Sequence, residues 1–184
     1  MGQYYMPVIK RGNIMRRVYS HDFDNGLKLM EHSYIGNNFI NVIANELVDN
    51  PAQLYWVGDY AEPNDFRSDA MYMRIAGYAW ERKRHDDTTL ENCNEEFDWS
   101  ADWYFINITK KQYILMPKDG DWVINPISLL TAIGNGRGGG DYHADRCADA
   151  VGIWAGDKVY LSKDAPPYWK YEYRTDIDFG KEEW

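Results

Sequence analysis

The sequence predicts an α+β fold in which an antiparallel sheet is built from two pseudo-repeated ββαβ halves, with helices on one face. Short apolar or alternating runs, separated by Gly, Asn, Asp and Pro, are typical of strands joined by turns. Two asparagine-led segments space their apolar residues as helices do. The sequence W-V-G-D at 56–59 is matched by W-A-G-D at 154–157, after corresponding predicted elements. This match indicates internal duplication, although four residues can also match by chance.

Residues 1–60 are predicted to form the first half of a single domain. Asn37 or Asn38 caps a helix that continues to about residue 49 and stops before Pro51. Its apolar residues recur at helical spacing. The other elements predicted in this half are strands at 3–9, 14–20 and 54–57, a turn at 10–13, and an ambiguous strand or helical turn at 27–31.

Residues 61–100 are interpreted as a connecting excursion, with a helix at 69–83 and a charge-dense, solvated remainder. The second half spans 101–163. Asn125 is its predicted helix cap, Pro126 occupies the first helical position, and Gly134 closes the helix. The predicted elements of this half are strands at 103–109, 112–116 and 158–162 and a helix at 127–133. The tail, 164–184, is expected to add an edge strand or to lie across the core.

Composition limits the partners. The chain has 184 residues and a formal net charge of −9, which argues against bulk nucleic acid or an anionic membrane as a partner. A small anionic ligand in a local pocket remains compatible with it. The 15 tyrosines and 8 tryptophans suit cores, interfaces and base-stacking pockets. Cys93 and Cys147 have no CxxC partner, and no signal peptide or membrane-spanning run is recognised, which together favour a cytoplasmic location.

The most distinctive stretch is 133–145, where five of the first eight residues are glycine. It follows a predicted helix, whereas Walker and Rossmann loops precede one. Successive backbone N–H groups can still cradle a phosphate, with Arg137 as a bidentate partner. The alternative is a flexible connection to the next strand. The predicted ligand-binding residues are Asn135, Gly136, Arg137, Gly138, Gly139, Gly140, Asp141, Tyr142 and His143.

Two further groups of polar residues have side chains that could bind a metal ion or act in acid–base catalysis. Asp141, His143 and Asp145, with Cys147 or Asp149, have ligand types that suit a divalent metal, but a solvated polar loop is favoured. The run at 21–24, His-Asp-Phe-Asp, suits acid–base work, but a locally hydrogen-bonded turn is favoured. No nucleophile motif is present. We therefore expect no cofactor, no metal and no catalytic residue.

Three segments carry a resemblance: 2–5 (GQYY), 20–31 and 134–141. They resemble a family of phage and bacterial proteins that open with MGQYY, for which no activity is established. The resemblance covers most of 1–60 and 104–160. It implies a phage or prophage setting, in which small acidic proteins often act against host defence.

These observations lead to three functional hypotheses. The leading one is a counter-defence protein that sequesters a small phosphorylated, nucleotide-derived signalling ligand without turnover. The alternatives are an acidic protein–protein inhibitor of a host defence protein, and a metal-dependent nucleotide-processing enzyme that uses Asp141, His143 and Asp145. A homodimer is compatible with the leading hypothesis.

Overall fold

A single mixed sheet organises the protein, as the predicted α+β class requires. The computed structural model describes residues 3–80, 96–118, 124–134, 148–177 and 179. Within them the strand order is β2-β1-β3-β7-β4-β5-β8, and β6 adds a second partner to β3. The pairs β3–β6 and β5–β8 are parallel and the others antiparallel. The strands are β1 (Tyr5–Arg11), β2 (Ile14–Arg17), β3 (Ala52–Gly58), β4 (Tyr104–Asn107), β5 (Gln112–Leu115), β6 (Ala132–Ile133), β7 (Lys158–Ser162) and β8 (Glu172–Tyr173).

Two of the helices begin where the sequence places their caps. The helices are α1 (Leu29–His32), α2 (Asn38–Leu47), α3 (Asp69–Trp80) and α4 (Pro126–Thr131). The Oδ1 atom of Asn37 accepts the N–H of Ile40 at 2.8 Å, which caps α2. Asn125 caps α4 in the same way, with Pro126 at the first helical position. Both predicted caps are confirmed. In the part of the chain that the structure describes, no helix is long and apolar enough to cross a membrane.

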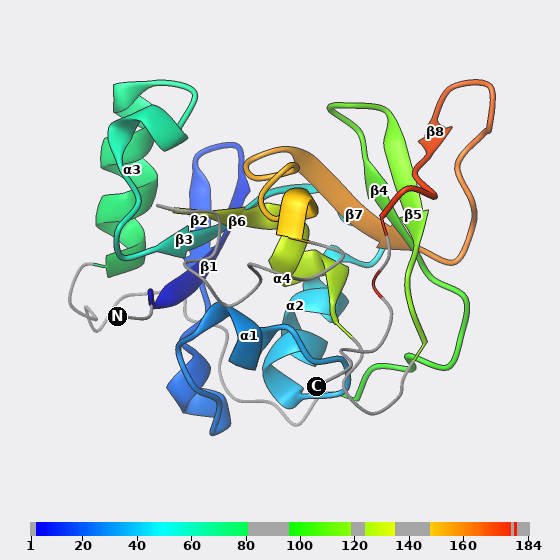
Figure 1. Cartoon of the computed structure of the whole chain (residues 1–184), viewed down its shortest axis with the longest axis horizontal. Helices are drawn as coiled ribbons and strands as arrows, with labels where there is room; N and C mark the ends of the chain where they lie inside the picture. The colour runs from blue at the N-terminus through cyan, green and yellow to red at the C-terminus, as the bar shows by residue number, and fades with distance from the viewer. Residues whose placement is uncertain (1–2, 81–95, 119–123, 135–147, 178, 180–184) are drawn as a thin grey trace.

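The sheet separates two apolar cores. Side chains alternate between the faces of a strand, so β3 directs Leu54 and Trp56 into a large core with α2 and α4. Its residues Tyr55 and Val57 face a smaller core covered by α3. The prediction that the helices share one face is therefore wrong for α3. Figure 1 shows α3 at the β1–β3 end of the sheet, and β4, β5 and β8 at the other end.

The predicted end of α4, the helix of the second half, needs correction, and the predicted internal duplication remains open. The helix ends at Thr131, so Gly134 does not cap it. Ala132 and Ile133 instead extend as β6, because they pair in parallel with Trp56 and Val57 of β3. In the repeated motif, Trp56 lies in β3, whereas Trp154 lies in a turn before β7, although both are buried in the large core. The two motifs differ in local structure, and duplication stays a hypothesis.

Candidate functional site

The predicted ligand-binding residues, 135–143, lie outside the described residues, as do Asp145 and Cys147 of the metal hypothesis. We call residues 135–147 the glycine-rich stretch, and the segments on both sides of it are described. One flank is β6, which ends next to Gly134. The other runs from the 3₁₀ turn Ala148–Ala150 to β7, and it is tied to α4. Gly152 N–H donates to the Leu129 carbonyl at 2.8 Å, and Trp154 N–H donates to that of Leu130 at 2.7 Å. The structure therefore gives the positions of the two described segments, β6 and the turn at Ala148–Ala150, that the stretch connects.

A pocket lies at the place where β3 changes partner. Residues 52–53 of β3 pair with β7, whereas residues 56–57 pair with β6, so the sheet forks between them. The pocket at this fork encloses about 290 Å³. All its lining residues except one belong to the flanks of the glycine-rich stretch, and we call it the fork pocket. It is lined by Asp65, Ala132, Ile133, Gly134, Val151, Gly152, Ile153 and Ala155. This volume is at the lower end of the range for ligand pockets.

The buried side chain of Gln3 fixes the backbone beside the fork pocket. Its amide end lies against the α-carbons of both Gly58, at the end of β3, and Gly134. A β-carbon at either glycine would collide with Gln3 Oε1. A side chain at either position would therefore force the amide of Gln3 to move. Gly134, the last described residue before the glycine-rich stretch, therefore lies against Gln3 of the amino-terminal segment.

An ion cluster lies next to the fork pocket. Asp65 and Ala155 line the pocket, and two residues beyond each of them come Arg67 and Asp157. Asp157 Oδ1 accepts a hydrogen bond from Arg67 Nη2, and Oδ2 lies 3.2 Å from Lys110 Nζ. Asn107 Nδ2 also donates to Oδ2, at 2.9 Å. We call Arg67, Asn107, Lys110 and Asp157 the Asp157 cluster.

The charges in this cluster do not balance. The Asp157 side chain is 3% exposed, whereas those of Arg67 and Lys110 are 52% and 44% exposed. A buried carboxylate needs a partner of opposite charge, and here it has two. A guanidinium has five N–H donors and an ammonium three, and contacts with Asp157 and with the Ile153 carbonyl do not use all of them. The cluster therefore presents surplus positive charge and hydrogen-bond donors to solvent.

Tyr55 adds a buried hydroxyl to the same region. Among the described residues its Oη has no hydrogen-bond partner. Burial raises the pKa of Tyr55, the charge of Arg67 opposes this rise, and the charge of Asp157 adds to it. The hydroxyl is therefore protonated at neutral pH and retains a proton to donate. Gly156, with φ of +71°, lets the chain pass directly against the Tyr55 ring.

The sequence interpretation missed this cluster. It placed Asp157 only in the W-A-G-D match and did not consider Arg67, Asn107 or Lys110. The partners of Asp157 lie 90, 50 and 47 residues away in the sequence, so no local motif joins them. The one local signal is the Gly-Asp pair before a strand, because Gly156 adopts a conformation that other residues rarely adopt.

The other sequence candidates lie elsewhere. His21 and Asp22 are in the 3₁₀ turn Ser20–Phe23, in agreement with the favoured turn, and His21 Nδ1 lies 3.2 Å from Tyr19 Oη. Asp59 accepts the N–H of Tyr4 at 3.0 Å and lines a groove of about 380 Å³ along α3. The aspartates of the two W-x-G-D motifs thus lie in different places, because Asp59 lines this groove and Asp157 lies next to the fork pocket. In the described ranges, no group of three or more His, Cys, Asp or Glu is placed to hold a metal ion.

Comparisons with known proteins return no relative. No protein-family model, no curated protein and no solved structure matches the chain.

Proposed function

We propose that the protein binds a small phosphorylated, nucleotide-derived ligand without turning it over, at the fork pocket and the Asp157 cluster. One observation carries this proposal. Two half-exposed cations converge on one buried carboxylate, beside a pocket whose walls are the flanks of the glycine-rich stretch. Arg137 and the backbone of residues 135–143 would complete the site.

The charge arrangement suits a phosphate group. Asp157 neutralises one of the two cations and fixes the positions of both, so that their heads are held in place before a ligand arrives. Arginine binds phosphate oxygens in a fork geometry, and lysine acts as a point charge. In a protein of net charge −9, this local surplus of positive charge favours binding of an anionic ligand at the Asp157 cluster.

The lining of the fork pocket supports binding without turnover. It consists of alanine, glycine, valine and isoleucine residues together with Asp65. The Oδ2 atom of Asp65 already accepts the N–H of Glu62 at 2.7 Å. Apolar walls with a few polar groups at the rim are typical of sites that select a ligand by shape and charge. In the phage setting that the resemblance implies, such a protein would sequester a host signalling nucleotide.

The first test identifies the ligand. The protein is purified gently from cells that make candidate immune nucleotides, then denatured, and the released material is analysed by mass spectrometry. A stoichiometric, intact nucleotide is expected. A converted nucleotide would contradict binding without turnover and favour an enzyme. Protein that is empty although the nucleotide is abundant would contradict the proposal and favour a protein partner.

The second test locates the site by titration calorimetry with nucleoside phosphates, cyclic dinucleotides and inorganic phosphate. Arg67→Ala and Lys110→Ala should each weaken binding roughly tenfold, the value of one charged hydrogen bond. Arg137→Ala should weaken it without unfolding the protein. Arg16→Ala and Lys118→Ala are matched controls, because these cations also pair with a carboxylate at the surface. Equal losses in the controls would contradict the assignment of the site.

A further inference from the structure

Charge is distributed unevenly along this acidic chain. Residues 104–118 and 158–174, which contain β4, β5, β7 and β8, carry seven Lys and Arg against two Asp and Glu, a balance of +5. The whole chain has a net charge of −9. Three of these cations, Lys110, Lys118 and Arg174, pair with Asp157, Asp102 and Asp176. The others include Lys111 and Lys158, both exposed. With these three aspartates counted as well, the balance of this end of the sheet is +2, whereas the whole chain is acidic.

At the same end of the sheet, no helix among the described residues lies over one of the two faces. The side chains of Phe105, Ile114 and Leu161 point into the large core under α2 and α4. Their neighbours along each strand point to the opposite face, which α3 covers only at β1 and β3. From the strand registers, this face carries Tyr104, Ile106, Tyr113, Leu115, Tyr160 and Tyr173, of which Leu115 and Tyr173 are exposed and Ile106 is buried. We call it the tyrosine face.

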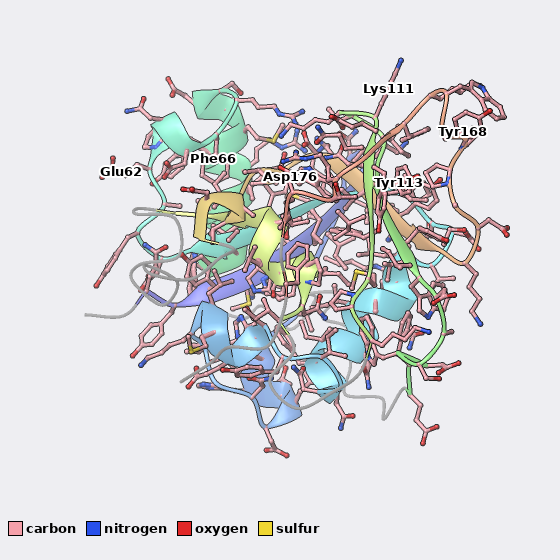
Figure 2. The ribbon with its side chains drawn as sticks, turned by 45° about the vertical axis from the view of Figure 1, so that its right-hand side comes forward. Glu62, Phe66, Lys111, Tyr113, Tyr168 and Asp176 are labelled. Carbon is pink, nitrogen blue, oxygen red and sulfur yellow. The ribbon has the colours of Figure 1, made fainter. Side chains whose placement is uncertain are left out.

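The tyrosines form an extended platform. The rings of Tyr113 and Tyr173 are stacked, with centroids 5.0 Å apart and planes 21° from parallel. Tyr104 meets Tyr113 edge-on at 6.1 Å. Beyond β7, the loop to β8 adds Tyr168 and Trp169, which are 81% and 70% exposed. Figure 2 shows Tyr113 and Tyr168 at the same end of the molecule, far from Phe66 beside α3.

Basic residues border this platform. Lys158 precedes Tyr160 by two positions in β7 and so belongs to the tyrosine face. Lys111 lies in the β4–β5 turn, and its side chain extends away from the sheet (Figure 2). Acidic groups nearby include Glu172 of β8, Asp49, whose charge acts on Tyr160, and Asp164, whose N–H donates to Ser162 Oγ. Burial is the main factor that raises the pKa of Tyr160, so its ring is a neutral phenol at physiological pH.

We propose that the tyrosine face binds single-stranded nucleic acid, whose bases stack on Tyr113 and Tyr173 while Lys111 and Lys158 contact the phosphates. Proteins that bind single strands combine aromatic side chains, on which bases stack, with a basic surface along the backbone. A sheet face with exposed aromatic side chains offers this stacking surface directly. The expectation of no bulk nucleic-acid partner rests on the net charge of the whole chain. A net charge does not reveal that positive charge is concentrated at one end of the sheet. This site is separate from the fork pocket and does not depend on the ligand proposed there.

The test is fluorescence anisotropy of a labelled oligo-dT of about 12 nucleotides, titrated with the whole protein at about 50 mM salt. Single-stranded DNA is expected to bind, and duplex DNA of the same length much more weakly. Tyr173→Ala should weaken binding roughly tenfold. Tyr173→Phe should restore it, because the ring that stacks is retained. Lys158→Ala should reduce the slope of log affinity against log salt by about 0.7, the value for one phosphate contact.

A matched control is available. Tyr60 is 47% exposed and Tyr173 is 46% exposed, but Tyr60 follows β3 and lies off the tyrosine face. Tyr60→Ala should bind as the unaltered protein does. The proposal would be overturned by an absence of single-strand binding at low salt, by duplex binding of equal strength, or by equal losses in Tyr60→Ala and Tyr173→Ala. Thermal unfolding of each variant shows that it is folded before it is compared.

Discussion

The indole Nε1 of Trp56 donates a hydrogen bond to Nδ1 of His32, 2.9 Å away in the large core. The other ring nitrogen, Nε2, lies 2.8 Å from the carbonyl oxygen of Gly26. Since Nδ1 accepts, Nε2 carries the proton and donates it to this carbonyl. Burial lowers the pKa of His32 to about 4, although the hydrogen bond to Gly26 acts in the opposite direction. The imidazole is therefore neutral in the folded protein.

A neutral buried histidine makes stability depend on pH. In the unfolded chain His32 takes up a proton near pH 6.5, whereas in the folded protein it does so near pH 4. Its contribution is fully present above pH 6.5 and is lost as the pH falls towards 4, by about 3 kcal/mol in total. Urea unfolding at pH 7 and pH 4.5 measures this loss. His32→Gln should lack this component and His21→Ala should keep it. Identical pH dependence in all three proteins would contradict the assignment.

Gly156 and Gly12 form a matched pair for backbone strain. Both have positive φ, but a β-carbon at Gly12 meets open space, whereas one at Gly156 meets the Tyr55 ring. Gly12→Ala should lower the free energy of unfolding by about 1 kcal/mol, through strain alone. Gly156→Ala should cost clearly more, because the ring must also move. Chemical denaturation of the two variants decides this, and equal losses would show that Tyr55 adapts freely.

The contact between Gln3 and Gly134 is tested by a second substitution. Gly134→Ala should destabilise the protein, since the added methyl group collides with the Gln3 amide. In a Gln3→Ala background the space is free, and the additional cost of Gly134→Ala should fall by about 1 kcal/mol. The four proteins of this cycle are compared by thermal unfolding. Additive losses would mean that Gln3 does not limit position 134.

Asp157 should couple the two cations energetically. Asp157→Asn retains the size of the side chain but removes the charge, and should reduce the free energy of unfolding by about 1–3 kcal/mol. Arg67→Ala should then cost less in the Asp157→Asn background than in the unaltered protein. The cost of Arg16→Ala, whose partner is Glu46, should be the same in both backgrounds. Denaturant titrations of the single and double variants measure this coupling.

The parts of the fold set by neighbouring residues could be predicted from sequence. The cap at Asn125 and the proline that follows it locate the start of α4, and β7 occupies 158–162 as expected. These features depend on side chains a few positions apart, whose effect survives in any tertiary context. Of the two arrangements expected for the tail, an edge strand or a course across the core, the structure has a strand, β8 beside β5.

Features that depend on distant residues could not be predicted. Residues 132–133 continue an apolar helical pattern, and only the edge of β3 makes them a strand. The side on which α3 packs depends on which strands form the sheet, since its own pattern specifies a buried face and not a neighbour. The Asp157 cluster joins four segments of the chain, and net charge alone conceals the basic end of the sheet.

The pairing of β3 has a consequence for synthesis of the protein. This strand, 52–58, obtains its neighbours on one side from residues 5–10, but on the other side from residues 132–133 and 158–159. While a ribosome is still making the middle of the chain, β3 has an unpaired edge, and an unpaired edge can recruit strands of other chains. An interior strand of the finished sheet is thus an outer strand for most of translation. Chaperone dependence during synthesis should end only once residues 158–159 have left the ribosome.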